Sequence, residues 1–243
     1  MARVSLGSPT PPPASNWDAP SIPNAEAREL GIVWAKLCQG EWRIIRHVQE
    51  ELRTTLHVGA RRGDGYSRWA IRGRSLVILQ RVLSGQSLNF ISLDLALSKS
   101  TVSAEFQFAM RALELEPRLS GLPMYLPQLW HASRARPFAD SALRDRFQGD
   151  QGTIVSLPRP ELRLTSVLTR AELEVCSILL QGQTHAEIAA RRGTSTRTIA
   201  NQLASIFTKL NVSGRLELLT TLARGRIRAS SGASRNTAKQ LCA

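Results

Sequence analysis

Side chains that could hydrogen-bond to nucleic-acid bases gather between Thr196 and Leu210. The apolar residues of this stretch recur at helical spacing, which predicts a helix with one buried face. They are Ile199, Leu203, Ile206, Phe207 and Leu210. The opposite face would carry Arg197, Ala200, Asn201, Ala204, Ser205 and Thr208. The amides of Asn201 and Gln202 could pair with adenine, and Arg197 could reach guanine or phosphate. Because small and amide residues replace the usual Glu and Lys, this helix could enter a major groove deeply.

Two capping boxes place the helices that would position this stretch. In Thr169-Arg170-Ala171-Glu172, and again in Thr184-His185-Ala186-Glu187, a threonine precedes a glutamate by three residues. In this motif each of the two side chains satisfies a free amide at the start of a helix. Gly182 and Gly193 follow the two helices and supply the left-handed residue that commonly ends one. The small pair Ala189 and Gly193 suits the close crossing of a helix-turn-helix.

Two further serines complete a four-helix bundle. Ser195 is predicted to cap the helix that begins at Thr196, and Ser213 to cap a fourth helix rich in leucine. Arg224, Arg226 and Arg228 follow that fourth helix. We interpret His185 as an exposed first-turn residue without a catalytic role and Cys176 as a core residue.

The combined pattern resembles the LuxR-type C-terminal helix-turn-helix over about residues 168–219. The strings that carry the resemblance are L-T-R-A-E-L-E-V, G-Q-T-H-A-E-I-A, G-T-S-T-R-T-I-A-N-Q-L and I-F-T-K-L-N-V-S-G-R-L-E-L. The resemblance implies that the third helix is the recognition helix, with Ala200, Asn201 and Ala204 facing bases, and that Lys209 approaches phosphates. It also suggests the fourth helix as a dimer contact.

These considerations give a predicted set of DNA-binding residues. The set is Thr184, Ser195, Thr196, Arg197, Thr198, Ala200, Asn201, Gln202, Ala204, Ser205 and Lys209. The sequence departs from the family pattern at Gln202, where histidine is common, and at Ala200 and Ala204, where lysine is commoner. Fewer charged side chains that could read bases therefore remain on this helix.

A second feature is an internal repeat at an offset of 97 residues. Seven residues between Leu83 and Leu115 recur identically at that offset, and they include the Gly, Gln and Ser at predicted helix boundaries. The identical residues are Leu83, Gly85, Gln86, Ile91, Ser98, Thr101 and Leu113. The short β-like run 55–58 lies 97 residues ahead of a similar run at 152–155, so each unit could be a β-hairpin followed by helices. Residues 41–49 could form the first strand of that hairpin, although a helix is also compatible with this stretch.

The first unit has a weaker candidate site. A possible second DNA site comprises Lys99, Ser100, Thr101, Ser103, Ala104 and Gln107. Glu105 stands where Gln202 stands in the second unit. Its carboxylate would suit neither a phosphate nor a base edge, unless it accepts a hydrogen bond from cytosine. Five basic residues oppose three acids between Trp69 and Leu115, against nine and four between Leu168 and Arg228. The first unit is therefore either a weaker DNA reader or a domain for pairing or for contacting another protein.

The predicted fold is mainly α, with two tandem helix-turn-helix bundles, each with a possible preceding β-hairpin, and disordered termini. We expect a disordered proline-rich tail at 1–28 and a degenerate helix-turn-helix unit with its hairpin at 29–133. A linker with short strands follows at 134–166, then the LuxR-type domain at 167–229 and a flexible tail at 230–243.

Composition limits the function classes. The 32 Lys and Arg against 19 Asp and Glu leave a net charge of +13, which favours a polyanionic partner. The cysteines Cys38, Cys176 and Cys242 lack metal or disulfide spacing, and we expect no metal and no cofactor. No catalytic motif is present, the histidines His47, His57, His131 and His185 are scattered, and we predict no enzyme. Neither a membrane-spanning run nor a secretory signal is recognisable.

The leading hypothesis is a sequence-specific transcription regulator that binds double-stranded DNA. Its other candidate partners are a second copy, through the C-terminal helix, and RNA polymerase, with no membrane. The alternative is a protein-interaction module that contacts the transcription machinery as the fourth region of a sigma factor does. The resemblance implies a bacterial protein of the cytoplasm, associated with the nucleoid.

Overall fold

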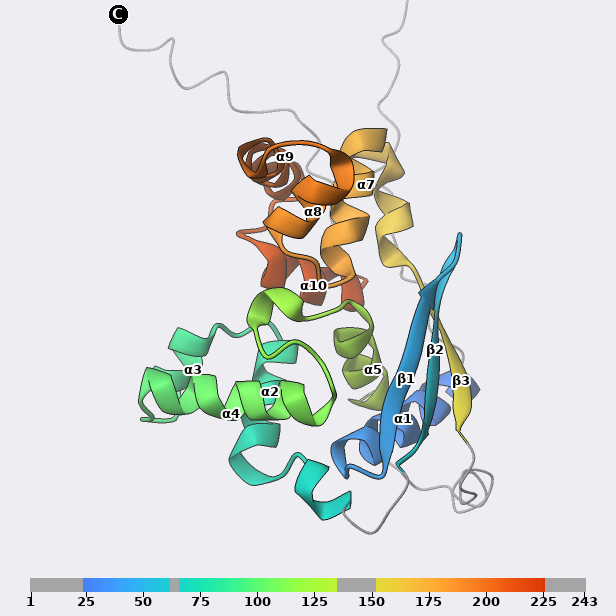
Figure 1. The fold of residues 1–243 in the computed structure, drawn as a ribbon, viewed down its shortest axis with the longest axis vertical. Coiled ribbons are helices and arrows are strands. Elements are labelled where there is room, and N and C mark those ends of the chain that lie inside the picture. Colours follow the sequence, from blue (N-terminus) through green and yellow to red (C-terminus); the bar gives the residue numbers. More distant parts are fainter. Residues whose placement is uncertain (1–23, 62–65, 135–151, 226–243) are drawn as a thin grey trace, which may run out of the picture.

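The structure is a computed structural model that describes residues 24–61, 66–134 and 152–225. Helices predominate within these ranges, and one small antiparallel sheet lies along one side (Figure 1). The predicted mainly helical class is confirmed at this level. No helix among the described residues is long and apolar enough to cross a membrane.

The upstream half begins with a helix and a β-hairpin. In chain order its elements are α1 (Asn24–Cys38), β1 (Trp42–Gln49), β2 (Arg53–Ala60), η1 (Tyr66–Trp69), α2 (Gly73–Leu83), α3 (Leu88–Asp94), α4 (Lys99–Ala112), η2 (Leu119–Gly121) and α5 (Tyr125–Arg134). The start of α1 corrects the predicted tail at 1–28. After Pro23 the chain carries apolar residues at helical spacing, and Leu30, Val33 and Leu37 are buried. The rest of that tail, like the predicted tail at 230–243, lies outside the described residues.

The downstream half contributes one strand and a helical group. Its elements are β3 (Thr153–Pro158), η3 (Pro160–Ser166), α7 (Arg170–Leu180), α8 (His185–Arg192), α9 (Thr196–Lys209) and α10 (Arg215–Ala223). The predicted linker at 134–166 thus supplies the third strand of the sheet and a 3-10 helix, and its residues 135–151 lie outside the described ranges.

The sheet joins the two halves, which corrects the expectation of a separate hairpin for each unit. Its strand order is β1-β2-β3, and both pairings are antiparallel. The two β-like runs identified in the sequence, at 55–58 and 152–155, lie on β2 and β3 and pair with each other. Pairing with β2 satisfies the backbone groups along one edge of β3, and sequence periodicity cannot predict such a partner.

A bulge in β1 changes which residues face the core. The register shifts between Ile44 and Arg46, so that Arg46 lies opposite His57 and His47 lies opposite the buried Leu56. The ring of His47 contacts that of Tyr125 in α5, with 5.4 Å between the ring centroids and a tilt of 50° between the planes. The prediction of a strand here is confirmed. Beyond the bulge the alternation of inward and outward residues is reversed, because one extra residue is inserted.

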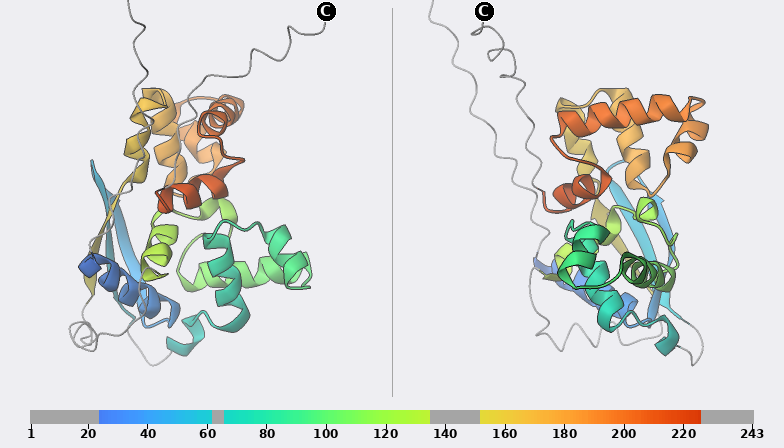
Figure 2. Two further views of the ribbon diagram at one scale, coloured as in Figure 1. Left: turned by 180° about the vertical axis from the view of Figure 1, so that it is seen from behind. Right: turned by 90° about the vertical axis from the view of Figure 1, so that its left-hand side faces the viewer.

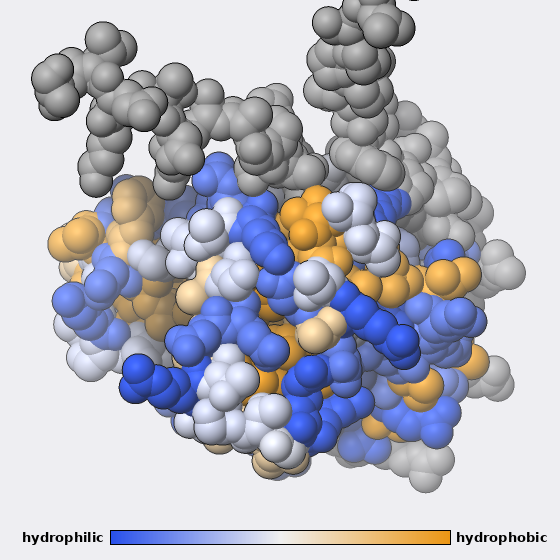
Figure 3. All heavy atoms as spheres, turned by 90° about the horizontal axis from the view of Figure 1, so that it is seen from above, coloured by the Kyte–Doolittle hydropathy of each residue, from blue (hydrophilic) through white to orange (hydrophobic). Residues whose placement is uncertain are grey.

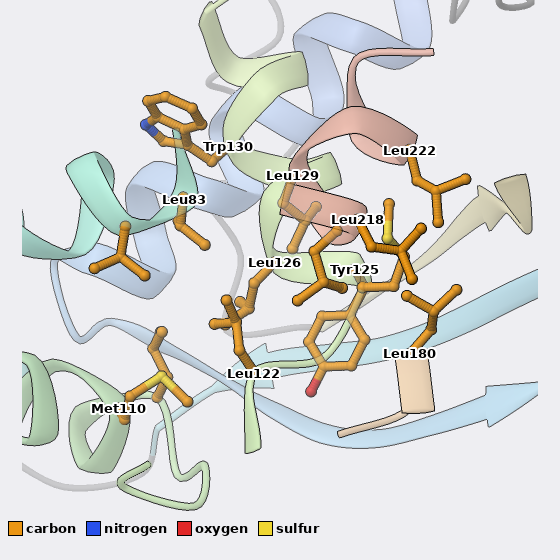
Figure 4. Packing of buried hydrophobic residues seen from close by; sticks show 14 of the residues in the cluster. Leu83, Met110, Leu122, Tyr125, Leu126, Leu129, Trp130, Leu180, Leu218 and Leu222 are labelled. Carbon is orange, nitrogen blue, oxygen red and sulfur yellow. The ribbon is translucent and has the colours of Figure 1, made fainter. Parts of the chain in front are cut away.

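The buried apolar residues form one continuous cluster through both halves. Figure 4 shows Leu122, Tyr125 and Leu126 of the upstream half close to Leu218 and Leu222 of α10, with Leu180 at the end of α7. The helical group that contains α9 therefore packs directly against the upstream half and is not a separate domain joined only by a linker.

A buried ion pair also fixes α7 to the sheet. Arg159 follows β3 and donates from Nε to Glu161 Oε1 at 2.9 Å. The same guanidinium donates from Nη2 to Ser177 Oγ of α7 at 2.8 Å, and Gln49 of β1 donates to Glu161 at 3.3 Å. Since Glu161 is almost fully buried, these contacts supply the partners that its carboxylate requires.

Candidate nucleic-acid interface

The caps predicted from the sequence set the positions of α7, α8 and α9. Thr169 and Thr184 each complete a capping box with Glu172 and Glu187, as predicted. Ser195 Oγ accepts from the Thr198 amide at 3.0 Å and starts α9. The turn between α8 and α9 depends on Gly193, whose φ of +62° is left-handed. These local signals build the helix-turn-helix in the predicted order.

One side of α9 packs on the other helices, and the other side is open. Ile199, Leu203 and Ile206 are buried against α7 and α8. The exposed residues at the start and along the open side are Ser195, Thr196, Arg197, Thr198, Ala200, Asn201, Ala204 and Thr208. The helix lies lengthwise along one end of the molecule in the right-hand view of Figure 2. A helix placed in this way can enter a groove without rearrangement of the fold.

Three residues of the predicted set do not join this open side. Gln202 is half-buried, and its Oε1 is buried without a hydrogen-bond partner. Ser205 donates to Glu172 Oε1 at 2.9 Å, and Lys209 Nζ lies 2.7 Å from Glu172 Oε2. The predicted contacts of Gln202 with adenine and of Lys209 with phosphate would require these side chains to change position. Thr184, the remaining member, is half-buried as the cap of α8.

Glu172 holds α9 against the beginning of α7. Burial raises the pKa of this carboxyl, but hydrogen bonds from Lys209, Thr169 and Ser205 outweigh burial, and the pKa falls to about 2. The sequence identified Glu172 only as half of a capping box. Its second role depends on the crossing of α7 and α9. Because Ser205 and Lys209 lie 33 and 37 residues after Glu172, no local signal in the sequence predicts these contacts.

Several arginines of this domain have no acidic partner, because its acids are engaged elsewhere. Each of the four acids in α7–α10 is engaged within the domain: Glu172 with Lys209, Glu174 with Arg192, Glu187 with the cap Thr184 and Glu217 with Ser213. Arg170, Arg191 and Arg197 are exposed and have no carboxylate partner among the described residues. Figure 3 looks down on this end of the molecule, and the surface there is mostly hydrophilic. The surface thus presents unpaired arginines on and beside a helix face that has no acidic residue, which suits a polyanion.

The fourth helix contacts the upstream half of its own chain. Its cap is Gly214, while the predicted cap Ser213 donates from its hydroxyl and its amide to Glu217. Arg215 donates to the Leu122 carbonyl at 3.2 Å, and Arg224 to the Ser84 carbonyl at 2.6 Å. A homodimer through α10, as the resemblance suggested, would have to displace or avoid these contacts.

The candidate residues of the upstream half lie on α4. Ser98 Oγ accepts from the Thr101 amide at 3.0 Å, so that Lys99 begins this helix as Thr196 begins α9. Lys99, Ser100 and Ala104 are exposed, whereas Thr101, Ser103 and Gln107 are half-buried. Glu105 is turned inward and accepts a hydrogen bond from Ser75 of α2.

Two further residues, His185 and Cys176, have the exposure that the sequence predicted. His185 is exposed in the first turn of α8, as predicted. Cys176 is fully buried, also as predicted, and burial raises the pKa of its thiol to about 12, with a smaller contribution from Glu161.

Comparison with known proteins identifies the downstream domain. Residues 166–222 match the family described as bacterial regulatory proteins, luxR family. The match covers α7, α8, α9 and all but the last residue of α10, so this part of the chain is a LuxR-family helix-turn-helix domain. Neither a curated protein nor a solved structure matches the chain.

Proposed function

We propose that this protein is a transcription regulator that binds double-stranded DNA sequence-specifically, with α9 as the recognition helix in the major groove. The observation that carries the proposal is the open side of α9. It has no acidic residue, it exposes Arg197 and Asn201, and it is accompanied by arginines without carboxylate partners. Arginine and asparagine are side chains that read guanine and adenine in the major groove.

The phosphate contacts would come from residues around α9. Arg170 and Arg191 lie at the start of α7 and the end of α8, and both side chains are exposed. Threonine and serine at the starts of α8 and α9 can add uncharged contacts to phosphate. Contacts of this kind fix the position of the domain on the duplex, while Arg197, Ala200, Asn201 and Ala204 would face base edges.

Salt dependence provides the first test. The full chain is titrated with a duplex recovered from a random DNA pool, at several salt concentrations. If about four phosphates are contacted, the affinity should fall about 100-fold between roughly 50 and 200 mM salt. A flat salt dependence, or failure to enrich any sequence, would contradict the proposal.

One observation favours a second candidate, contact with the transcription machinery such as RNA polymerase. Phe90 and Leu93 on α3 are 52% and 79% exposed, although such large apolar side chains are usually buried. Their counterparts 97 residues later are Glu187 and Ala190, so this apolar pair is specific to the upstream half. On this hypothesis α3 contacts a protein, and DNA affinity is incidental.

We also propose that the two halves are copies of one unit. The helices α2, α3 and α4 begin at Gly73, Leu88 and Lys99, and α7, α8 and α9 begin 97 residues later in each case. The turns agree as well, since Gly85 and Gly182 have φ values of +99° and +98°. Two unrelated helical segments would share helix periodicity, but the equal spacing of the three helix starts and the matching serine caps of α4 and α9 support duplication.

A further inference from the structure

The pairing of β2 with β3 has the symmetry that a two-fold related pair of units would have. Leu56 pairs with Val155, and Val58 pairs with Thr153. A shift by 97 residues carries Leu56 onto Thr153 and Val58 onto Val155, so it exchanges the two pairs. The pair His57 and Ile154 is carried onto itself. The register therefore places a local pseudo-two-fold axis at His57 and Ile154, between the two units.

Under the shift by 97 residues, the helix equivalent to α9 is α4. Both helices are 14 residues long, and each is capped by a serine that accepts from the amide three residues later. The outward side of α4 is polar near its start, where Lys99, Ser100 and Ala104 are exposed. Further along, Arg111 donates to Gln107 at 3.1 Å, and Gln107 donates to Ser103 at 3.3 Å.

The three acidic residues between Trp69 and Leu115 are engaged with other side chains and are not free to repel an anionic ligand. Glu105 accepts from Ser75, Asp94 is paired with Arg81, and Glu114 is paired with Arg61. In contrast, Arg72, Arg74 and Lys99 are exposed without a carboxylate partner among the described residues, and Arg111 is exposed with only its amide partner. The acid that the sequence placed on the ligand-facing side of α4 is thus removed from it.

We propose that α4 is a second duplex-DNA-binding helix, so that one chain presents α4 and α9 as a pseudo-two-fold pair. This inference rests on the proposed function of α9. The duplex would contact Lys99 and Arg111 through phosphates, and Ala104 would permit close approach to base edges. Phe108 is 41% exposed on the same helix and can contact thymine methyl groups, as apolar side chains do in the major groove.

The test uses matched substitutions in the full chain. Lys99→Glu with Ala104→Glu changes the face of α4, and Thr196→Glu with Asn201→Glu changes the equivalent positions of α9. All four residues are exposed. Lys99 and Thr196 lie in the first turn, where a negative charge favours a helix, and glutamate at positions 104 and 201 is a good helix former. Arg46→Glu with Gln39→Glu is the control, because it makes the same charge change as the α4 pair at exposed positions outside both helices. Thermal unfolding monitored by circular dichroism verifies that each variant is folded.

The readouts are the protected base pairs on DNA selected by the full chain and the slope of log affinity against log salt. The α4 variant should lose one of two protected segments, bind about 10-fold more weakly, and show a salt slope smaller by about 1 to 2. The control variant should keep both segments. Unchanged protection and slope in the α4 variant would overturn the inference and leave a protein as the ligand of the upstream half. Unchanged protection in the α9 variant would instead overturn the proposed function.

Discussion

Replacing Arg197 by glutamate is expected to lower the affinity of the full chain for its selected DNA at least about 100-fold. The guanidinium is exposed on the open side of α9 and has no carboxylate partner among the described residues. Its removal forfeits a contact that is worth about 1–3 kcal/mol, and the new carboxylate would be repelled by phosphates. A fluorescence anisotropy titration at one fixed salt concentration measures the loss.

Arg46→Glu is the matched control for this experiment. Arg46 is also exposed, but it lies on β1, outside the helix-turn-helix. The control lowers the net charge equally, so it should cost less than about 3-fold by general electrostatics alone. Equal losses in the two variants would mean that net charge, and not a contact of α9, determines binding.

Replacing Gly182 by alanine is expected to lower the free energy of unfolding by about 3 kcal/mol. Gly182 has a φ of +98°, which side chains with a Cβ rarely adopt. A Cβ there would lie 2.9 Å from the carbonyl oxygen of Gly121, which is backbone and cannot move aside cheaply. The substitution therefore adds a steric clash between the two halves to the conformational strain. Urea denaturation at neutral pH measures the difference.

Gly193→Ala separates these two costs. Gly193 also has a positive φ, +62°, but a Cβ would meet no atom within 4 Å. Only the strain of the left-handed conformation remains, and we expect a loss of about 1 kcal/mol. If Gly182→Ala were no more destabilising than Gly193→Ala, the close approach of η2 to the turn after α7 would not contribute to stability.

The local parts of the downstream domain could be predicted from the sequence because their signals are local. A threonine and a glutamate three residues apart define the start of α7 and of α8, and a glycine marks the left-handed turn after each. The start of α9 follows from Ser195 in the same way. These motifs need no information from distant residues, so the helix order and nearly all boundaries agree with the structure.

The orientation of individual site residues could not be predicted in this way. Lys209 and Ser205 contact Glu172, which lies more than 30 residues earlier, and Glu105 contacts Ser75 of another helix. The sheet shared by the two halves could not be predicted for a similar reason, since β2, with which β3 pairs, lies about 100 residues earlier in the chain. The alternation of inward and outward side chains in β1 is also interrupted by a bulge, and no residue type there predicts it.

The most direct test of the account compares the DNA sequences selected by the full chain and by its Asn201→Ala variant. Asn201 is exposed at the centre of the open side of α9, and truncation leaves the exposed arginines Arg170, Arg191 and Arg197 in place. We predict that the variant still binds DNA and selects the same motif, except that the preference is lost at one or two adjacent base pairs. An identical motif with identical preferences at every position would contradict the claim that α9 reads bases.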